Sequence, residues 1–496
     1  MSEIRTASSI ILTRGPDHNP EIYLVLRSER LRFMGGFWAF PGGTLMQEDY
    51  GDANERDEER AFLNCGLREL FEETGILPGS LGENLSEADK SRVRDQLLNS
   101  ESLDDWLEIV NACVFDDNEF IPVCQITTPP FSPLRYRTNF IHIRLPEGAE
   151  PVIKKGELVE GKFIQPAAAI KAWERGELRI APPNLYLIRL LTEYQFPEFY
   201  REARLQTGRF DDTSLLPVYF TPGILMAPLK TPTLPPATTT NTLIVGHERL
   251  YVVEPATYDT DEQERLFEKM DELTAQGEKF EAILLTHHHP DHVGAVNAVS
   301  QRYQLPVRAH PLTYDRIPAG FIPGEPLEDG NRIALGTAPD GSPDWHLSVI
   351  ATPGHAPDHL CYLESRYHAA FVGDMLSTVS TILIDPPEGH MHTYLRSLER
   401  LLEYPIKTLY PSHGPIHGDG HKLIRKFIEH RRRREEKLLE GLTAAPRSVD
   451  ELLPEVYDDV TEATYPIAAR SLLAGLIKLQ EDGKCEQAGG GWKLVK

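Results

Sequence analysis

The pattern of apolar and polar residues divides the chain into three blocks, and the first reaches to about Leu191. It opens with alternating, strand-like runs at 7–12 and 22–26. A glycine-rich turn at 41–43 precedes a helical stretch at about 58–74, and Gly75 is a plausible helix stop. Prolines between 197 and 236 then predict a linker that runs into an extended lead-in.

The second block begins near Val218 and alternates strands with helices. Strand-like runs at 242–245 and 250–253 precede a helix, in which Thr260 and Gln263 have the spacing of a capping box. A strand at 282–285 leads directly into a histidine cluster, and the βαβ-like alternation continues to about His417.

The third block is helical from about Lys422. Ser448 and Glu451 have capping-box spacing, an apolar-faced helix is expected at 468–479, and glycines at 489–491 suit the turn of a short hairpin. Helices followed by a small hairpin predict a winged-helix-like fold.

Composition and charge narrow the class of protein. The 496 residues suggest two to four domains, and 41% hydrophobic and 25% charged residues are ordinary for globular protein. The net charge of -24 does not favour nucleic acid as a partner. Five scattered cysteines without C-x-x-C spacing indicate a reducing compartment, and the sequence shows neither a signal peptide nor a long apolar run. We expect a soluble, cytoplasmic protein that has no membrane as a partner.

The strongest chemical pattern is the run from Thr286 to His292. His287 and His289 are two residues apart in extended chain, so both side chains can reach one metal ion. Asp291 and His292 follow on the next turn and can approach a second ion. Imidazole and carboxylate are ligands of zinc, and mixed nitrogen and oxygen shells also suit iron or manganese.

Three further candidates lie in small-residue turns that follow apolar runs. They are His355 in T-P-G-H, Asp374 in G-D-M and His413 in P-S-H-G. The remaining histidines are expected to have ordinary polar roles: His288, His310, His359, His390, His392 and His417.

This pattern resembles the metallo-β-lactamase superfamily, in a branch with a C-terminal winged helix, over about residues 218–496. The resemblance implies an αββα sandwich and a hydrolase with two Zn ions, or Mn or Fe. It further implies that His287, His289 and His355 hold the first ion, that Asp291, His292 and His413 hold the second, and that Asp374 bridges them. Asp291 is also expected to be catalytic. Glu254 stands where the family usually has an aspartate that supports the site.

A second pattern lies on the predicted helix of the first block. Glu69, Glu72 and Glu73 are spaced i, i+3 and i+4, so their carboxylates share one face. Such a concentration of negative charge suits an oxygen-seeking cation such as magnesium.

With the preceding F-P-G-G, this string resembles the Nudix box, in the coenzyme A diphosphatase branch, over about residues 5–192. The resemblance implies an α/β/α fold in which Glu72 and Glu73 bind Mg or Mn and Glu69 is a further ligand or base. The chain departs from the family in an insertion between Gly43 and Arg68 and in Arg60, where a glutamate is usual.

A basic stretch between Lys422 and Lys437 includes Arg431, Arg432, Arg433 and Arg434. It could face RNA or a nucleotide, but four consecutive arginines point around most of a helix, which favours a solvated face.

The sequence therefore predicts an α/β and α+β multidomain chain: a Nudix domain at 1–205, a linker at 206–217, a metallo-β-lactamase domain at 218–420 and a winged-helix-like domain at 421–496. The expected substrates are a small ester or thioester at the dimetal site and a nucleoside diphosphate derivative, such as coenzyme A, at the Nudix site. The alternatives are an endoribonuclease acting on single-stranded RNA, and a Nudix domain that only binds and senses a nucleotide.

Overall fold

A computed structural model describes residues 4–31, 34–50, 57–78, 81, 85–99, 103–111, 118–154, 156–210 and 215–495. The chain divides into two compact units, Met1–Pro222 and Gly223–Lys496. Four cysteines in the described residues carry free thiols, as expected, and Cys113 lies outside those residues. None of the helices in the described ranges combines the length and apolarity that crossing a bilayer requires.

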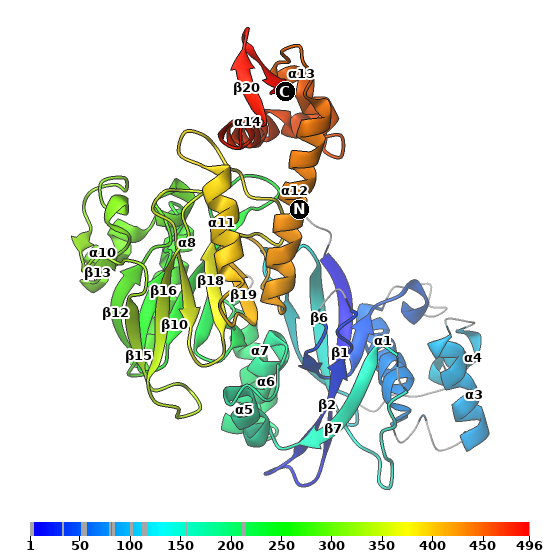
Figure 1. The fold of residues 1–496 in the computed structure, drawn as a ribbon. Coiled ribbons are helices and arrows are strands. Elements are labelled where there is room, and N and C mark those ends of the chain that lie inside the picture. The colour runs from blue at the N-terminus through cyan, green and yellow to red at the C-terminus, as the bar shows by residue number, and fades with distance from the viewer. Residues whose placement is uncertain are drawn as a thin grey trace. The chain divides into compact units, whose positions relative to one another are not determined.

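Unit 1 is built on a seven-stranded mixed sheet (Figure 1). Its central strand β1 (Ile4–Arg14) pairs in parallel with β6 (Arg135–Arg144) and antiparallel with β2 (Glu21–Arg27) and β4 (Gly42–Thr44). Outside these lie β3 (Trp38–Ala39) and β7 (Leu158–Ile164) on β2, and β5 (Ile121–Thr127) on β6.

Helix α1 (Glu58–Thr74) carries the acidic string and confirms the predicted helix. Asp57 caps its first turn, and Gly75 ends it in the left-handed conformation, which a residue without Cβ adopts at little cost. Its apolar side packs against β1 in a buried core. The other helical elements in the described part of unit 1 are η1 (Gln47–Tyr50), α3 (Glu87–Leu98), α4 (Asp104–Asn111), α5 (Pro166–Glu174), α6 (Pro182–Glu193) and α7 (Glu198–Thr207), followed by strand β8 (Val218–Thr221).

The proline-rich segment is more ordered than the sequence predicts. Pro197 is the N-cap of α7, a place where the missing amide hydrogen costs nothing, so a helix stands at the start of the expected linker.

Two large sheets form the first part of unit 2. The first runs in the order β14-β13-β12-β11-β10-β9 and the second in the order β15-β16-β17-β18-β19. The strands of the first sheet are β9 (Ile224–Lys230), β10 (Thr239–Gly246), β11 (Arg249–Val253), β12 (Lys279–Leu284), β13 (Pro306–Arg308) and β14 (Ile322–Pro323). Those of the second are β15 (Arg332–Gly336), β16 (Trp345–Ala351), β17 (Leu360–Glu364), β18 (Ala369–Gly373) and β19 (Thr408–Pro411).

Helices cover the outer faces of both sheets, which gives the αββα layering expected from the sequence (Figure 1). The first sheet is flanked by α8 (Thr260–Ala275), with α9 (Pro290–Val293), α10 (Val296–Tyr303) and η2 (Pro311–Thr313) between its strands. On the second sheet, α11 (Met391–Leu401) and the start of α12 (Gly420–Gly441) bury their apolar side chains against β17 and β18 in one continuous core.

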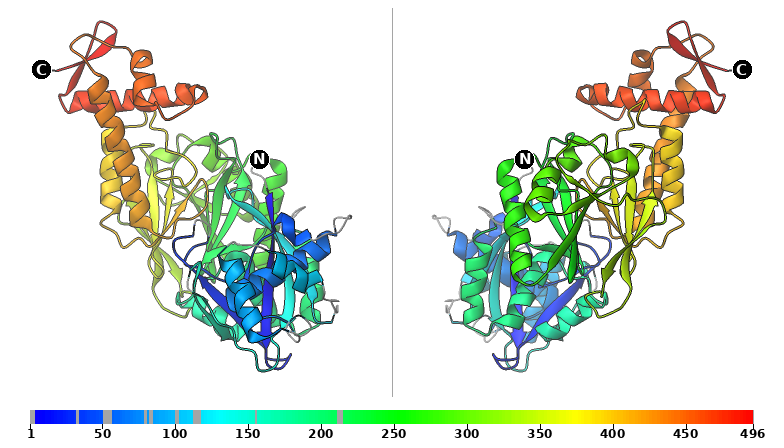
Figure 2. Two further views of the ribbon diagram at one scale, coloured as in Figure 1. Left: turned by 90° about the vertical axis from the view of Figure 1, so that its right-hand side faces the viewer. Right: turned by 90° about the vertical axis from the view of Figure 1, so that its left-hand side faces the viewer.

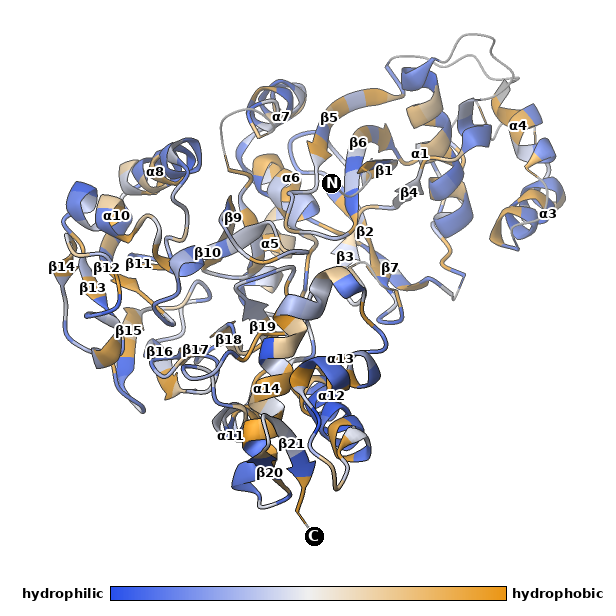
Figure 3. Cartoon of the chain, turned by 90° about the horizontal axis from the view of Figure 1, so that it is seen from above, coloured by the Kyte–Doolittle hydropathy of each residue, from blue (hydrophilic) through white to orange (hydrophobic). Residues whose placement is uncertain are grey.

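The chain ends in a small helical domain with a hairpin, as predicted. Helix α12 continues from the second sheet into this domain (Figure 2), where α13 (Val449–Val456), η3 (Glu462–Thr464), α14 (Tyr465–Glu481), β20 (Cys485–Ala488) and β21 (Gly491–Leu494) share a second core. In Figure 3 much of α12 is hydrophilic, whereas α14 is largely hydrophobic. Both capping groups of the Ser448–Glu451 box are present.

The predicted capping box of α8 is wrong. Thr260 is already the first helical residue, and Asp259 caps the helix by accepting hydrogen bonds from the amides of Asp261 and Glu262. Aspartate is at least as good an N-cap residue as threonine, and Asp259 stands one position before Thr260.

Candidate metal centre

The predicted ligands of the second block all follow the carboxyl ends of strands in unit 2. The histidine run follows β12, His355 follows β16, Asp374 follows β18 and His413 follows β19. Strands β11 and β12 are parallel, as are β18 and β19, so each pair ends at the same edge of its sheet. The topology therefore brings together side chains that are far apart in the sequence.

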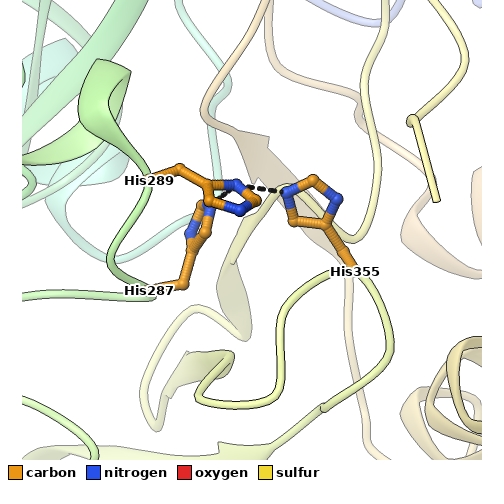
Figure 4. Close-up of side chains that lie close together, drawn as sticks. All are labelled: His287, His289 and His355. Carbon is orange, nitrogen blue, oxygen red and sulfur yellow. Dashed lines mark hydrogen bonds between the residues drawn. The ribbon is translucent and has the colours of Figure 1, made fainter. Parts of the chain in front are cut away.

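One group of ligand atoms comes from His287, His289 and His355, whose rings point toward one another (Figure 4). His289 Nδ1 lies 3.0 Å from His287 Nε2 and 2.9 Å from His355 Nε2. All three atoms lie within 4.8 Å of one another, a spacing that one ion could fill. These are the three residues predicted for the first ion.

A second group comes from Asp291, His292 and His413. Asp291 Oδ2 lies 3.5 Å from His413 Nε2, and Asp291 Oδ1 lies 3.6 Å from His292 Nε2. These are the residues predicted for the second ion.

Asp374 lies between the two groups. Its Oδ1 is 3.3 Å from His413 Nε2 and 3.7 Å from His292 Nε2, whereas its Oδ2 is 3.6 Å from His355 Nε2. One oxygen thus faces each group, which is the arrangement that a bridging carboxylate requires.

The hydrogen bonds of these side chains fit metal ions. Among the described residues, His292 Nε2 and Asp374 Oδ1 are buried and have no hydrogen-bond partner, although buried polar atoms seldom lack one. On the side away from the site, His355 Nδ1 lies 2.8 Å from Leu383 O and His413 Nδ1 lies 3.1 Å from Thr239 O. These contacts fix the rings and leave each Nε2 directed into the site, as in histidines that bind metals.

Glu254 connects the loops that carry the ligands. Its buried carboxylate accepts a hydrogen bond from Ser412 Oγ at 2.6 Å, lies 3.0 Å from His292 Nδ1 and accepts another from Thr286 Oγ1. Thr286 Oγ1 is in turn 2.9 Å from His287 Nδ1. These contacts agree with the expected supporting role of Glu254, because the longer side chain reaches the loops after β12 and β19.

The histidines and aspartates around Asp374 stabilise each other's charged forms. Burial disfavours the charged form of His413, yet Asp374 and Asp291 raise its pKa to about 10. Burial likewise opposes ionisation of Asp374, but His413 and His292 hold its pKa well below the usual value. At the first group, burial and the neighbouring His355 lower the pKa of His289 to about 3, so its ring is neutral and able to bind a metal.

Two histidines that the sequence assigned to ordinary roles support the site. His359 is buried, its Nε2 accepts a hydrogen bond from the amide of Asp374 at 3.1 Å, and its Nδ1 lies 2.9 Å from Thr352 Oγ1. An added Cβ at Gly373 would lie 2.5 Å from the same Nε2, so the glycine permits the close approach. His288 Nδ1 lies 2.9 Å from Asp358 Oδ1. These contacts are long-range, so no local spacing reveals them.

Five of the candidate ligands line a pocket of about 360 Å³, namely His289, Asp291, His355, Asp374 and His413. Its other walls come from the segments 232–237 and 380–383, from Arg431 on α12, and from residues between 457 and 471 of the C-terminal domain. This domain therefore forms part of the wall of the candidate site.

In unit 1, two of the three predicted carboxylates point to the glycine turn. Gly42 N donates to Glu73 Oε2 at 3.0 Å, and the carboxylate of Glu69 lies against Gly43, where it would meet an added Cβ. Glu72 is instead 3.7 Å from Arg68 Nη1. In the described part of the chain, the three carboxylates do not form a ligand group within 4.8 Å, unlike the histidine groups.

Crowding and burial raise the pKa values of these carboxylates. Burial and the adjacent Glu69 raise the pKa of Glu72 to about 7, and burial raises that of Glu73 well above its usual value. A bound cation would offset this repulsion.

The arginine run is not a uniformly solvated face, so this expectation is half wrong. Arg432 and Arg433 are exposed and lie 3.2 Å and 3.0 Å from carboxylate oxygens of Glu399 and Glu429. Arg431 and Arg434 are buried, because the C-terminal domain packs against that side of α12.

The family model of the Metallo-beta-lactamase superfamily matches residues 234–413, and that of the Beta-lactamase associated winged helix domain matches residues 448–492. A Caenorhabditis elegans protein, Beta-lactamase-like protein 2 homolog, is 27% identical over 43% of this chain and 70% of its own length. The Atrochrysone carboxyl ACP thioesterase of Aspergillus novofumigatus is 28% identical over 40% of this chain and 62% of its own length. A NUDIX hydrolase structure from Alicyclobacillus acidocaldarius covers 40% of this chain and 97% of its own, with 23% identity and a TM-score of 0.33.

Unit 2 therefore contains a metallo-β-lactamase superfamily domain followed by a winged-helix domain. The site geometry and the family together support a metal-dependent hydrolase.

Asp374→Ala removes both oxygens that face the two ligand groups. We expect the metal content to fall from roughly two ions per chain to about one, since the remaining ligands of the second group cannot replace the bridge. Elemental analysis after dialysis measures this, and Asp315→Ala, an exposed aspartate of the same domain, is the control. An unchanged metal content in Asp374→Ala would rule out the bridging role.

Glu254→Gln keeps the size of the side chain but removes its charge. It should weaken zinc binding by roughly 10- to 100-fold, because the outer contacts of His292 and of Thr286 beside His287 are lost or reversed. Competition with a chelator measures the affinity, and Glu248→Gln, an exposed neighbour, is the control. Equal affinities of Glu254→Gln and the wild type would contradict the supporting role.

Proposed function

We propose that unit 2 is a dimetal hydrolase that cleaves an ester or thioester of a small metabolite. The observation that carries the proposal is the pocket itself, in which both candidate ligand groups and Asp374 open into one cavity of metabolite size. Cavities of roughly 300–1,000 Å³ are typical of small-molecule sites.

The proposed roles follow the geometry. His287, His289 and His355 would hold one Zn, Mn or Fe ion, Asp291, His292 and His413 the other, and Asp374 both. Two such ions would supply a hydroxide at neutral pH and polarise the oxygen of the attacked group. Asp291 is about one-fifth exposed on the pocket side and would hold its ion or accept a proton from the attacking water.

The walls of the pocket support an acyl substrate. Leu234, Ile382 and Ile467 give it apolar surface close to the ligands, and Thr464 and Ser471 add hydroxyl groups. This surface suits an apolar acyl chain better than a phosphodiester backbone. The similarity to a protein named as an acyl carrier protein thioesterase agrees with this chemistry.

The surface charges support the small metabolite over RNA. Of the four arginines at 431–434, two are buried and two lie beside glutamates, so this part of α12 does not offer an open basic groove. The net charge of -24 also opposes binding of a polyanion.

For unit 1 we propose a Nudix pyrophosphohydrolase that acts on a nucleoside diphosphate derivative such as coenzyme A. Glu69, Glu72 and Glu73 would bind Mg or Mn, with Glu69 as a ligand or base. Supporting this, a cavity of about 190 Å³ is lined by Gly42 and Gly43, next to the carboxylates, and by the cation Arg27. The alternative that unit 1 only binds and senses a nucleotide rests on the departures of its motif.

A hydrolysis screen of the purified protein with zinc, manganese or magnesium tests the first proposal. We expect acyl thioesters to be hydrolysed and Asp374→Ala to lose most of that turnover, with single-stranded RNA left intact. Cleavage of RNA that is lost in Asp374→Ala, without thioester hydrolysis, would make the protein an endoribonuclease instead.

Glu73→Gln tests the second proposal. Cleavage of a pyrophosphate such as that of coenzyme A should fall roughly tenfold or more, because an anionic oxygen is removed from the proposed ion. Thioester cleavage should persist, and Glu59→Gln, exposed on the first turn of the same helix, should behave as wild type. If the wild type cleaves no nucleotide pyrophosphate, unit 1 is a binding module.

A further inference from the structure

Arg431 is a buried cation in the wall of the candidate active-site pocket. Its side chain is 5% exposed, one of its amino groups donates to the carbonyl of Ile382, and its guanidinium lies 5.4 Å from the centre of the Tyr394 ring. Among the described residues, its Nε has no hydrogen-bond partner and no carboxylate forms an ion pair with it. A buried charge without a counter-charge is costly, so the protein holds this cation at the expense of its own stability.

The neighbouring arginines differ from Arg431, because each of them has an acidic partner. Arg434, one turn further along α12, is also buried but lies 2.5 Å from Asp459 Oδ1 and donates to the carbonyl of Val456. The exposed Arg432 and Arg433 each have a glutamate partner. In the described run 431–434, only Arg431 is without an acidic partner, and only Arg431 lines the pocket of the metal ligands.

The same short segment positions Arg431 and the metal ligands. The carbonyl of Leu383 lies 2.8 Å from Nδ1 of His355, and the carbonyl of the preceding Ile382 accepts the hydrogen bond of Arg431. Adjacent backbone groups thus orient a candidate ligand of the first ion and the unpaired cation toward one cavity. A substrate in that cavity would meet both.

We propose that Arg431 binds a carboxylate of the substrate, so that the preferred substrate is an ester or thioester whose acyl group ends in a carboxylate. This inference rests on the proposed hydrolase function and specifies its substrate class. Arg431 is the one arginine or lysine among the described residues that line the cavity, and a single guanidinium matches a monoanion better than a phosphate dianion. A planar carboxylate also suits the planar donors of a guanidinium.

Binding is tested first, without catalysis. We expect dicarboxylates from succinate to suberate to raise the Tm of the metal-loaded wild type, with the best chain length set by the cavity. Arg431→Met should lose this shift, and Arg432→Met, on the exposed side of the same helix, should keep it. No dicarboxylate shift in the wild type, or an equal shift in Arg431→Met, would overturn the proposal.

Methionine is chosen because it replaces the arginine with an uncharged side chain of similar length that should not prevent folding. Because Arg431 has no acidic partner that would be left unpaired, Arg431→Met should leave the Tm of the ligand-free protein unchanged or raise it. Arg431→Lys keeps the charge and should keep part of the dicarboxylate shift. If Arg431→Met melts much lower and Arg431→Lys shows no shift, Arg431 is a structural residue and the proposal fails.

Specificity is tested with matched acyl thioesters that end in a carboxylate or in a methyl group. The wild type should prefer the carboxylate by roughly tenfold to a hundredfold in kcat/KM, mainly through KM, and Arg431→Met should lose that preference. Hydrolysis without any carboxylate preference would overturn this inference while leaving the hydrolase proposal intact. A dicarboxylate shift in Tm that depends on Arg431, without thioester hydrolysis, would support carboxylate binding by Arg431 and contradict the hydrolase proposal.

Discussion

Glu254 is a buried carboxylate on which the geometry of the candidate metal centre depends. It directly follows β11 and has a positive φ of 53°. Its carboxylate contacts Thr286 and His292 in the run after β12, and Ser412 after β19. A carboxylate that is 2% exposed must have its oxygens satisfied within the protein, so these segments cannot move apart without exposing or orphaning it. The candidate ligands that these segments carry are therefore held in place by the protein itself.

The outer contacts of the other ligands extend the same principle. His355 and His413 are fixed by backbone carbonyls, and the amide of Asp374 is fixed by His359. The segment 382–383 that orients His355 also accepts a hydrogen bond from Arg431 of α12. The same stretch of backbone therefore positions a candidate ligand and a residue of the opposite pocket wall. In the function proposed above, the candidate metal ligands would carry out the chemistry and Arg431 would select the substrate, from different walls of one cavity.

Several candidate ligands of this centre lie in recognisable local patterns after apolar strand-like runs, and the family resemblance assigns them to two groups. The i, i+2 pair His287 and His289 and the glycine turn before Asp374 are local patterns, and the structure brings them together as expected. Helix α1 and the terminal hairpin were equally predictable, because a capping residue and turn glycines fix their ends.

What the sequence could not show depends on tertiary contacts. His359 is four residues after His355, yet its function comes from the amide of Asp374, which packing alone brings near. The arginine run indicates four directions around a helix, but it does not tell which of them the C-terminal domain buries. At α8, two adjacent residues compete for one cap, and only the backbone geometry decides for Asp259 over Thr260.

X-ray absorption at the metal edge of the purified protein shows directly whether two ions are bound by these residues. We expect a shell of nitrogen and oxygen only, dominated by imidazole, and a metal–metal distance of about 3.5–4 Å, as for two ions held by these histidines and bridged by Asp374. A spectrum without metal–metal scattering, or with sulfur in the shell, would contradict it.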